Sequence, residues 1–167
     1  MNFKYYLRRL QESSDYRKFM KENPEAFLSS GFFTIDRDGD DNKQHLDFFI
    51  PNAKRMASFQ MEQDGKMTFI DLFDEKVPEK ISLDFDLDFE EIEEKIKAKM
   101  IAHEVNSRIQ KFIFSLQKLD GRDYLIGTIF LSMFGLLKIS FDVKSREIVN
   151  FEKKSFFDMI NIFKRSN

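Results

Sequence analysis

The sequence predicts an α+β protein in which antiparallel sheet packs against helices. Eight segments alternate apolar and polar residues, the period of a half-buried strand, and they fall into two groups of four. Each group follows a stretch in which apolar residues recur every three or four positions, as on one face of a helix. We therefore expect two helix-plus-four-strand units, residues 1–75 and 87–167, joined by a linker at residues 76–86. They form either two lobes or one continuous sheet.

Composition excludes several classes of protein. With 42% hydrophobic and 34% charged residues, the chain has the balance of a soluble globular protein, and 21 Phe with no Trp must supply most of the aromatic core. A net charge of −2 gives no field that favours nucleic acid or an anionic membrane. The absence of cysteine excludes disulfides and thiolate sites. Residues 1–10 show no signal peptide, so we expect a cytoplasmic protein.

The first helical pattern begins near the N-terminus, and one helix face carries Phe3, Tyr6, Leu7 and Leu10. Ser13 and its neighbours offer a cap, after which the apolar face continues to Asn23. Pro24 disfavours helical geometry at Asn23, so the helix ends there. The pattern fits one bent helix or two separate helices.

The first four strands follow in two hairpins. Residues 26–35 and 44–50 are expected to pair across a polar, turn-forming run. Residues 55–62 and 66–73 are expected to pair across a turn that contains Gly65.

The second unit begins with a helix whose start is predicted by several residues. Asp88 can cap it, Glu91 stands where a capping box needs it, and Leu87 and Ile92 are placed for a hydrophobic staple. The helix is expected to end at residues 106–107.

Four more strands are expected after this helix. Phe112, Phe114 and Leu116 share one face of the first of them. The turns are expected at residues 120–121, 134–135 and 144–146, and the chain closes with a short helix capped by Ser155. Its apolar side would carry Phe156, Phe157, Ile160 and Phe163.

A local echo bears on whether the two units arose by duplication. Residues 49–59 can be laid over residues 141–151, with Phe at both ends and a basic residue in the turn of each. The match spans eleven positions, so both duplication and chance remain open.

The hairpin at residues 141–149 resembles the closing hairpin of PepSY-type domains. A hairpin of the form x-D-x-x-T-G-E-V is typical of that family. Asp142, Glu147 and Ile148 match it, while Ser145 and Arg146 replace the usual Thr-Gly. The resemblance covers residues 87–151 and, more faintly, the N-terminal half. It implies a cystatin-like sheet wrapped on a helix, and a role in binding or restraining a partner protein, often a peptidase.

The residues between the first two strands raise the question of a metal site, because spaced carboxylates can hold Ca²⁺. Asp36, Asp38 and Asp40 occupy positions 1, 3 and 5 of a candidate loop. Position 6, where a calcium loop needs Gly, is Asp41, and position 12 is Asp47 in place of Glu. These three aspartates are a weak candidate for cation binding, and a solvated hairpin loop is the simpler interpretation.

No other pattern carries recognisable chemistry. The two histidines, His45 and His103, have no ligand spacing, and the chain has neither a Gly-rich phosphate loop nor a nucleophile elbow. We predict no catalytic residue and no cofactor. The basic residues of the first helical region fit a charged outer face better than a nucleic-acid site: Lys4, Arg8, Arg9, Arg17, Lys18 and Lys21.

The function predicted from these observations is a non-catalytic protein-interaction or regulatory module. Residues 125–137 are strongly apolar, too short to span a bilayer, and need cover, so a partner protein or a homodimer through the sheet is expected. The alternative is a small-molecule-binding or enzymatic protein of the cystatin/NTF2-like kind, with a Phe-lined pocket between helix and sheet. Its lining would come from Phe112, Phe114, Phe130 and Phe141, with Ser115, Thr128 and Ser140 nearby.

Overall fold

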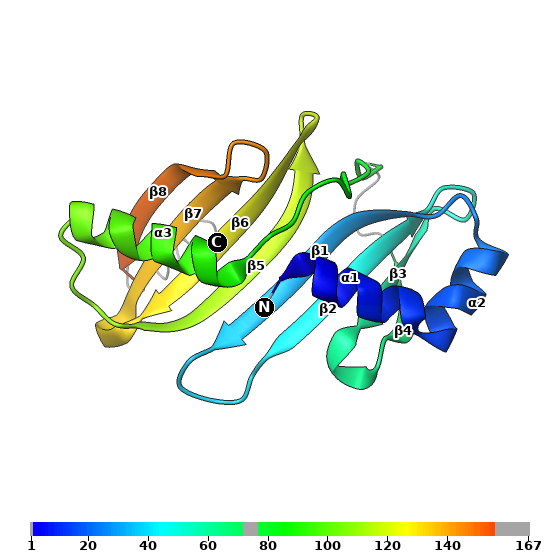
Figure 1. The fold of residues 1–167 in the computed structure, drawn as a ribbon, viewed down its shortest axis with the longest axis horizontal. Helices are drawn as coiled ribbons and strands as arrows, with labels where there is room; N and C mark the ends of the chain where they lie inside the picture. The colour runs from blue at the N-terminus through cyan, green and yellow to red at the C-terminus, as the bar shows by residue number, and fades with distance from the viewer. Residues whose placement is uncertain (1, 72–76, 156–167) are drawn as a thin grey trace, which may run out of the picture.

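Eight antiparallel strands form one continuous sheet, and the helices lie across one of its faces (Figure 1). The structure is a computed structural model that describes residues 2–71 and 77–155. The strand order is β4-β3-β2-β1-β5-β6-β7-β8. The predicted α+β class is confirmed, and of the two predicted arrangements the structure has the continuous sheet.

The elements repeat in order along the chain. The first half comprises α1 (Phe3–Glu12), α2 (Ser14–Glu22), β1 (Phe27–Asp36), β2 (Lys43–Ile50), β3 (Arg55–Gln60) and β4 (Lys66–Ile70). The second half comprises α3 (Phe89–Ala102), β5 (Ile109–Leu119), β6 (Arg122–Leu131), β7 (Gly135–Asp142) and β8 (Glu147–Ser155). Short 3₁₀ turns, Met61–Gln63 and Ser132–Phe134, follow β3 and β6.

The N-terminal helical region is two helices, because Ser13 interrupts it with an extended backbone. Its hydroxyl oxygen accepts from the Tyr16 N–H at 3.2 Å, which caps α2 as predicted. Asn2 caps α1 in the same way by accepting from the Tyr5 N–H. The second helix ends at Glu22 with Asn23 as its C-cap, immediately before Pro24, as predicted.

The cap of α3 is confirmed, but its capping box is wrong. Asp88 accepts from the Glu90 N–H at 3.0 Å, whereas the Glu91 carboxylate turns away to accept from the guanidinium of Arg146. The helix also ends at Ala102, earlier than expected. Glu104 adopts a left-handed conformation, with φ of 55°, and this conformation ends the helix.

The two halves meet at the centre of the sheet, where β1 pairs with β5. The register runs from Ser30 opposite Gln117 to Asp36 opposite Lys111. The starts of α1 and α3 are joined as well, since the Phe3 N–H donates to the Leu87 carbonyl at 2.9 Å. Each half therefore places its helix start and its first strand against the equivalent parts of the other.

This arrangement shows that the local echo does not align the halves. Residues 49–59 span the β2–β3 hairpin, and residues 141–151 span the β7–β8 hairpin. From the strand order, however, the counterpart of the β2–β3 hairpin is the β6–β7 hairpin. The architecture repeats, but these eleven residues lie at non-equivalent positions, so they are no support for duplication.

The core lies between the helices and the sheet and is built largely from Phe. Phe112, Phe114 and Leu116 are buried on one face of β5, as the alternation predicts. The Phe33 ring on β1 lies 5.9 Å from the ring of Tyr6 on α1 and 4.9 Å from that of Phe89 on α3. One core therefore extends beneath helices from both halves.

The linker between the two halves contacts the sheet through Ile81. Although most residues of this segment are polar or charged, Ile81 is fully buried and its N–H donates to the Leu28 carbonyl at 2.9 Å. An apolar side chain within a charged stretch explains why this part of the linker lies against β1. The closing helix predicted after Ser155 lies outside the described residues.

Gly127 on β6 tests the packing of the sheet. A Cβ there would lie 2.7 Å from Cγ1 of Ile139 and 2.9 Å from Cε1 of Phe114, both in the core. Overpacking of this kind costs about 1–3 kcal/mol, so Gly127→Ala should lower the free energy of unfolding by that amount in urea denaturation. The control is Gly39→Ala, whose Cβ would meet only the Asp36 carboxylate. Equal stability of the two variants would contradict the packing.

Tyr6 should make stability depend on alkaline pH. Burial in the core raises the pKa of Tyr6 to about 12, whereas the unfolded side chain ionises near 10. Its contribution to the free energy of unfolding is therefore fully present below about pH 10 and is lost as the pH rises to about 12. Urea denaturation across this range should show a shallower decline for Tyr6→Phe than for the wild type. Parallel declines would be evidence against this assignment.

Candidate binding surface on the open face of the sheet

The face of the sheet opposite the helices, here called the open face, carries an apolar patch at its centre. Phe33 contacts rings of α1 and α3, so its neighbour Phe32 points to the open face. Phe32 lies opposite Ser115, which lies opposite Ile126, and the register brings Ile113 and Tyr124 to the same side. The central patch is defined by these half-buried side chains: Phe32, Ile113, Tyr124 and Ile126.

A polar cluster on β1 and β2 lies beside the central patch. The Ser30 hydroxyl donates to Oδ2 of Asp47 at 2.8 Å, and Nε2 of His45 lies 3.5 Å from the same oxygen. The His45 ring is stacked on Phe32 with centroids 4.9 Å apart. Asp47 is only 8% exposed, and its Oδ1 has no hydrogen-bond partner among the described residues. A buried carboxylate oxygen without a hydrogen bond is unfavourable, so a donor placed next to it would be stabilising.

The polar cluster does not have the geometry of a catalytic triad. In a triad the histidine lies between serine and aspartate, so that it can take the serine proton. Here Asp47 lies between Ser30 and His45, and both contact the same carboxylate oxygen. His45 therefore has no place from which to take the proton of Ser30. The cluster presents hydrogen-bonding groups without an activated nucleophile. Sequence reasoning missed it, because only strand pairing brings Ser30 of β1 to Asp47 of β2.

The aspartates proposed as a cation site are largely occupied by the protein itself. Oδ1 of Asp36 accepts from the backbone N–H groups of Asp38 and Gly39, each at 3.1 Å. Asp40 is exposed at the tip of the loop. Within residues 2–71 and 77–155, no group of three or more His, Asp or Glu side chains is arranged to hold a metal ion.

The other carboxylates of this loop bind basic residues of β5 and of the residues before it. Asp38 accepts from the Arg108 guanidinium and from Nε2 of Gln110, and these hydrogen bonds lower the pKa of Asp38. Asp41 accepts from the Lys111 ammonium at 2.5 Å, which is the main cause of its pKa of about 2. The loop is therefore fastened to the second half of the chain by ion pairs.

The residues expected to line a pocket between helix and sheet are divided between the two faces. Phe112, Phe114 and Phe141 are each 1% exposed, and the first two stack at 5.5 Å, so they fill the core. Phe130 points to the open face, and so do Ser115, Thr128 and Ser140 by alternation. His103, the second histidine, lies at the end of α3 and stacks on Phe151.

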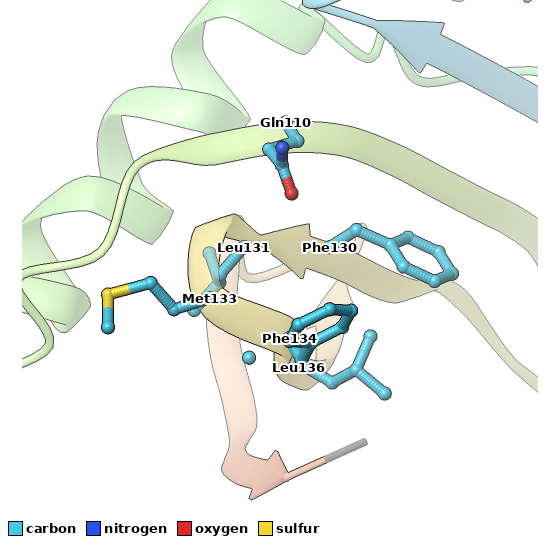
Figure 2. Close-up of a pocket in the computed structure, with 7 residues that line it drawn as sticks. Gln110, Phe130, Leu131, Met133, Phe134 and Leu136 are labelled. Atoms are coloured by element: carbon cyan, nitrogen blue, oxygen red, sulfur yellow. The ribbon is translucent and has the colours of Figure 1, made fainter.

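A cavity of about 410 Å³, here called the tip pocket, lies at the β6–β7 turn (Figure 2). The side chains of Phe130, Phe134 and Leu136 gather on one side of this hairpin, whereas Met133 points away from them. Leu136 is buried but does not belong to the core beneath the helices. The tip pocket is thus a separate apolar feature of the open face.

The turn beside the tip pocket has large apolar residues where the backbone favours Asn or Gly. Met133 and Phe134 have φ of 61° and 59°, a left-handed conformation in which a hairpin turn favours Asn and Gly. They are also 91% and 69% exposed. The expected turn at residues 134–135 is displaced by one residue, and Gly135 has φ of −80°. Bulky apolar residues at a strained, exposed turn are typical of a functional segment.

The strain at this turn can be measured. Asn tolerates the left-handed conformation, so Met133→Asn should raise the free energy of unfolding by roughly 0.5–1 kcal/mol in urea denaturation. Met133→Ala is the matched control, because alanine loses the exposed side chain but keeps the conformational cost. An equal gain in both variants would show that the exposed methionine, and not the backbone, is responsible.

The hairpin that resembles PepSY-type domains has a specific geometry. Oδ1 of Asp142 accepts from the N–H groups of Ser145 at 2.8 Å and Lys144 at 2.9 Å, which lowers the pKa of Asp142. Arg146 stands where the family pattern has Gly, and its φ is 59°. Its guanidinium pairs with Glu91 and donates to the Asp86 carbonyl. The contacts with Glu91 and Asp86 hold Arg146 in a conformation that glycine adopts freely.

Comparison with known proteins supports the fold and no more. No protein-family model matches the chain, and no curated protein matches it. The chain is similar to the solved structure of a "putative lipoprotein" from Clostridium difficile 630, with 14% identity and a TM-score of 0.53. The match covers 84% of this chain and 90% of that one. In the part of this chain that the structure describes, no helix is long and apolar enough to cross a membrane.

Proposed function

We propose that this chain is a non-catalytic protein-binding module that contacts its partner through the central patch. The observation that carries the proposal is the division of the sheet into two faces. Among the described residues the helices cover one face (Figure 1). The other face carries Phe32, Ile113, Tyr124 and Ile126, which are half-buried at its centre. Aromatic and aliphatic side chains grouped in this way are typical of a protein interface.

The polar cluster supports the same proposal. Interfaces combine an apolar centre with hydrogen-bonding groups at its edge. The imidazole of His45 is stacked on Phe32, and the carboxylate of Asp47 lies 3.5 Å from that imidazole. A partner side chain with N–H groups, such as arginine or lysine, has the chemistry that Asp47 favours.

The resemblance to PepSY-type domains fits a binding role, and we extend it to both halves as PepSY-like units. The Asp142 turn supports this proposal, because its carboxylate organises the hairpin in which the motif lies. We further propose that the interaction takes place in the cytoplasm, a reducing compartment with which the absence of cysteine is compatible.

The proposal is tested by a charge placed in the central patch. Ile126→Lys should abolish partner binding, because it sets an ammonium group in the apolar centre of the interface. Ile101→Lys is the matched control, since Ile101 is exposed on α3 and lies on the helix side. Proteins captured from native lysate by wild type and Ile101→Lys, and lost with Ile126→Lys, are the expected result. Capture of the same proteins by all three would contradict the proposal.

The same variants decide whether the partner is a second copy of the chain. Sedimentation velocity over a range of protein concentrations would show a dimer for wild type and Ile101→Lys, and a monomer for Ile126→Lys. A monomer for all three, together with patch-dependent capture of another protein, would assign the patch to a different partner. Circular dichroism on each variant checks that the fold is retained.

A further inference from the structure

We propose that the tip pocket binds the hydrocarbon chain of a long-chain carboxylate, such as a free fatty acid, and that Lys138 pairs with the carboxylate group. The cavity has a suitable size, since its volume of about 410 Å³ lies within the usual range for small ligands, about 300–1,000 Å³. This inference does not depend on the proposed function, because the central patch and the tip pocket share no residue.

The lining of the tip pocket favours an apolar ligand. Phe130, Phe134 and Leu136 line the cavity and gather on one side of the hairpin (Figure 2). The one polar side chain in the lining, Gln110, already donates from Nε2 to Asp38 at 3.0 Å. A sugar or a nucleotide would bury hydrogen-bonding groups against this surface without partners, which is unfavourable. A hydrocarbon chain has no such groups, so it is the chemistry that fits.

The β6–β7 turn adds a reason for the ligand to bind here. Phe134 has a left-handed φ of 59°, and its side chain is 69% exposed. The ring lies beside Phe130 and Leu136, so one chain of methylene groups can contact all three side chains (Figure 2). Covering these side chains removes apolar surface from water, which favours binding.

A lysine lies where the head group of such a chain would leave the cavity. Lys138 follows Leu136 by two residues on β7, so it lies on the same face of the sheet and roughly 7 Å further along the strand. The side chain is half-buried, and its ammonium group makes no ion pair or hydrogen bond with another residue that the structure describes. A carboxylate would give this ammonium group a charged partner.

The neighbouring charges leave this role to Lys138. Glu152 lies opposite Lys138, but its Oε2 pairs with the ammonium of Lys154 at 3.2 Å and its Oε1 accepts from Nδ2 of Asn150 at 3.1 Å. Lys111, on the other side of the pocket, is paired with aspartates of the β1–β2 loop. Lys138, Lys154 and Glu152 together carry one net positive charge, which favours an anionic head group over a cationic one.

The chain is tested by isothermal titration calorimetry of the full-length protein with dodecanoate, below the concentration at which micelles form. One molecule should bind per chain. Decanoate should bind roughly tenfold more weakly, because each buried methylene group contributes up to about fourfold.

The head group is tested by comparing dodecanoate with dodecanol. Lys138→Gln should weaken dodecanoate binding by roughly tenfold and leave dodecanol binding unchanged, because only the carboxylate pairs with the ammonium group. Lys153→Gln is the matched control. Lys153 lies opposite Leu137, a core residue, and therefore faces the helix side of the sheet. Its loss should change the binding of neither ligand.

The position of the chain is tested by Phe134→Asn, which removes the ring at a left-handed position that asparagine tolerates. Both ligands should then bind at least about tenfold more weakly. The control is Leu119→Asn, because Leu119 is also exposed but lies nine residues along β5 from Gln110, roughly 30 Å away. Circular dichroism checks that each variant keeps the fold.

Three results would overturn the proposal. The first is no binding of dodecanoate, or binding that Phe134→Asn leaves unchanged. The second is an equal loss in Lys138→Gln and Lys153→Gln, because the head group would then not be held at Lys138. The third is sedimentation with phosphatidylglycerol vesicles in the absence of any binding to the free acid, which would assign the pocket to a lipid surface.

Discussion

The pairing of β1 with β5 is the constraint on which the rest of the structure depends. It joins the first strand of each half, so that neither of these strands is left as an edge that could pair with another chain. The same pairing brings Phe33 beneath α1 and α3 at once, which merges two potential cores into one. Ion pairs between the β1–β2 loop and Lys111 lie at the end of this pairing. Separating the halves would expose aromatic core and break these ion pairs.

In a sheet with helices on one face, alternate residues of each strand point to the core and to the open face. On β5, Phe112 and Phe114 fill the core, while Ile113 between them faces the other side. A soluble protein gains nothing from an apolar residue at such a position unless something covers it, because exposed apolar surface is unfavourable in water. The central patch and the tip pocket are two regions where this occurs. They lie at different places on the open face, and their chemistry differs: the central patch borders His45 and Asp47, whereas the tip pocket is almost wholly apolar.

Local signals could be predicted from the sequence, and long-range ones could not. The caps at Asp88 and Ser13 and the alternation along β5 depend on neighbours in the chain, and all were predicted. Contacts between distant residues have no such signature. The spacing of the neighbouring aspartates suggests a metal ligand at Asp38. The actual partner of Asp38 is Arg108, which lies 70 residues further along the chain. The echo of residues 49–59 failed for the same reason, since strand order decides which hairpins are equivalent.

The residues of the β6–β7 turn do not suit the backbone conformation of the turn. A hairpin selected for stability alone would place Asn-Gly at Met133 and Phe134, where the backbone is left-handed. The opposite has occurred: the residues there are large, apolar and exposed, which costs conformational energy and solubility together. Neighbouring turns show that the fold does not require this. At residues 120–121 an Asp-Gly pair meets the same left-handed requirement in the usual way. Arg146 also adopts the left-handed conformation in the β7–β8 hairpin, but it is charged, so the tip differs in the exposed apolar character of Met133 and Phe134. Contact with another apolar surface is the physical reason that accounts for this character.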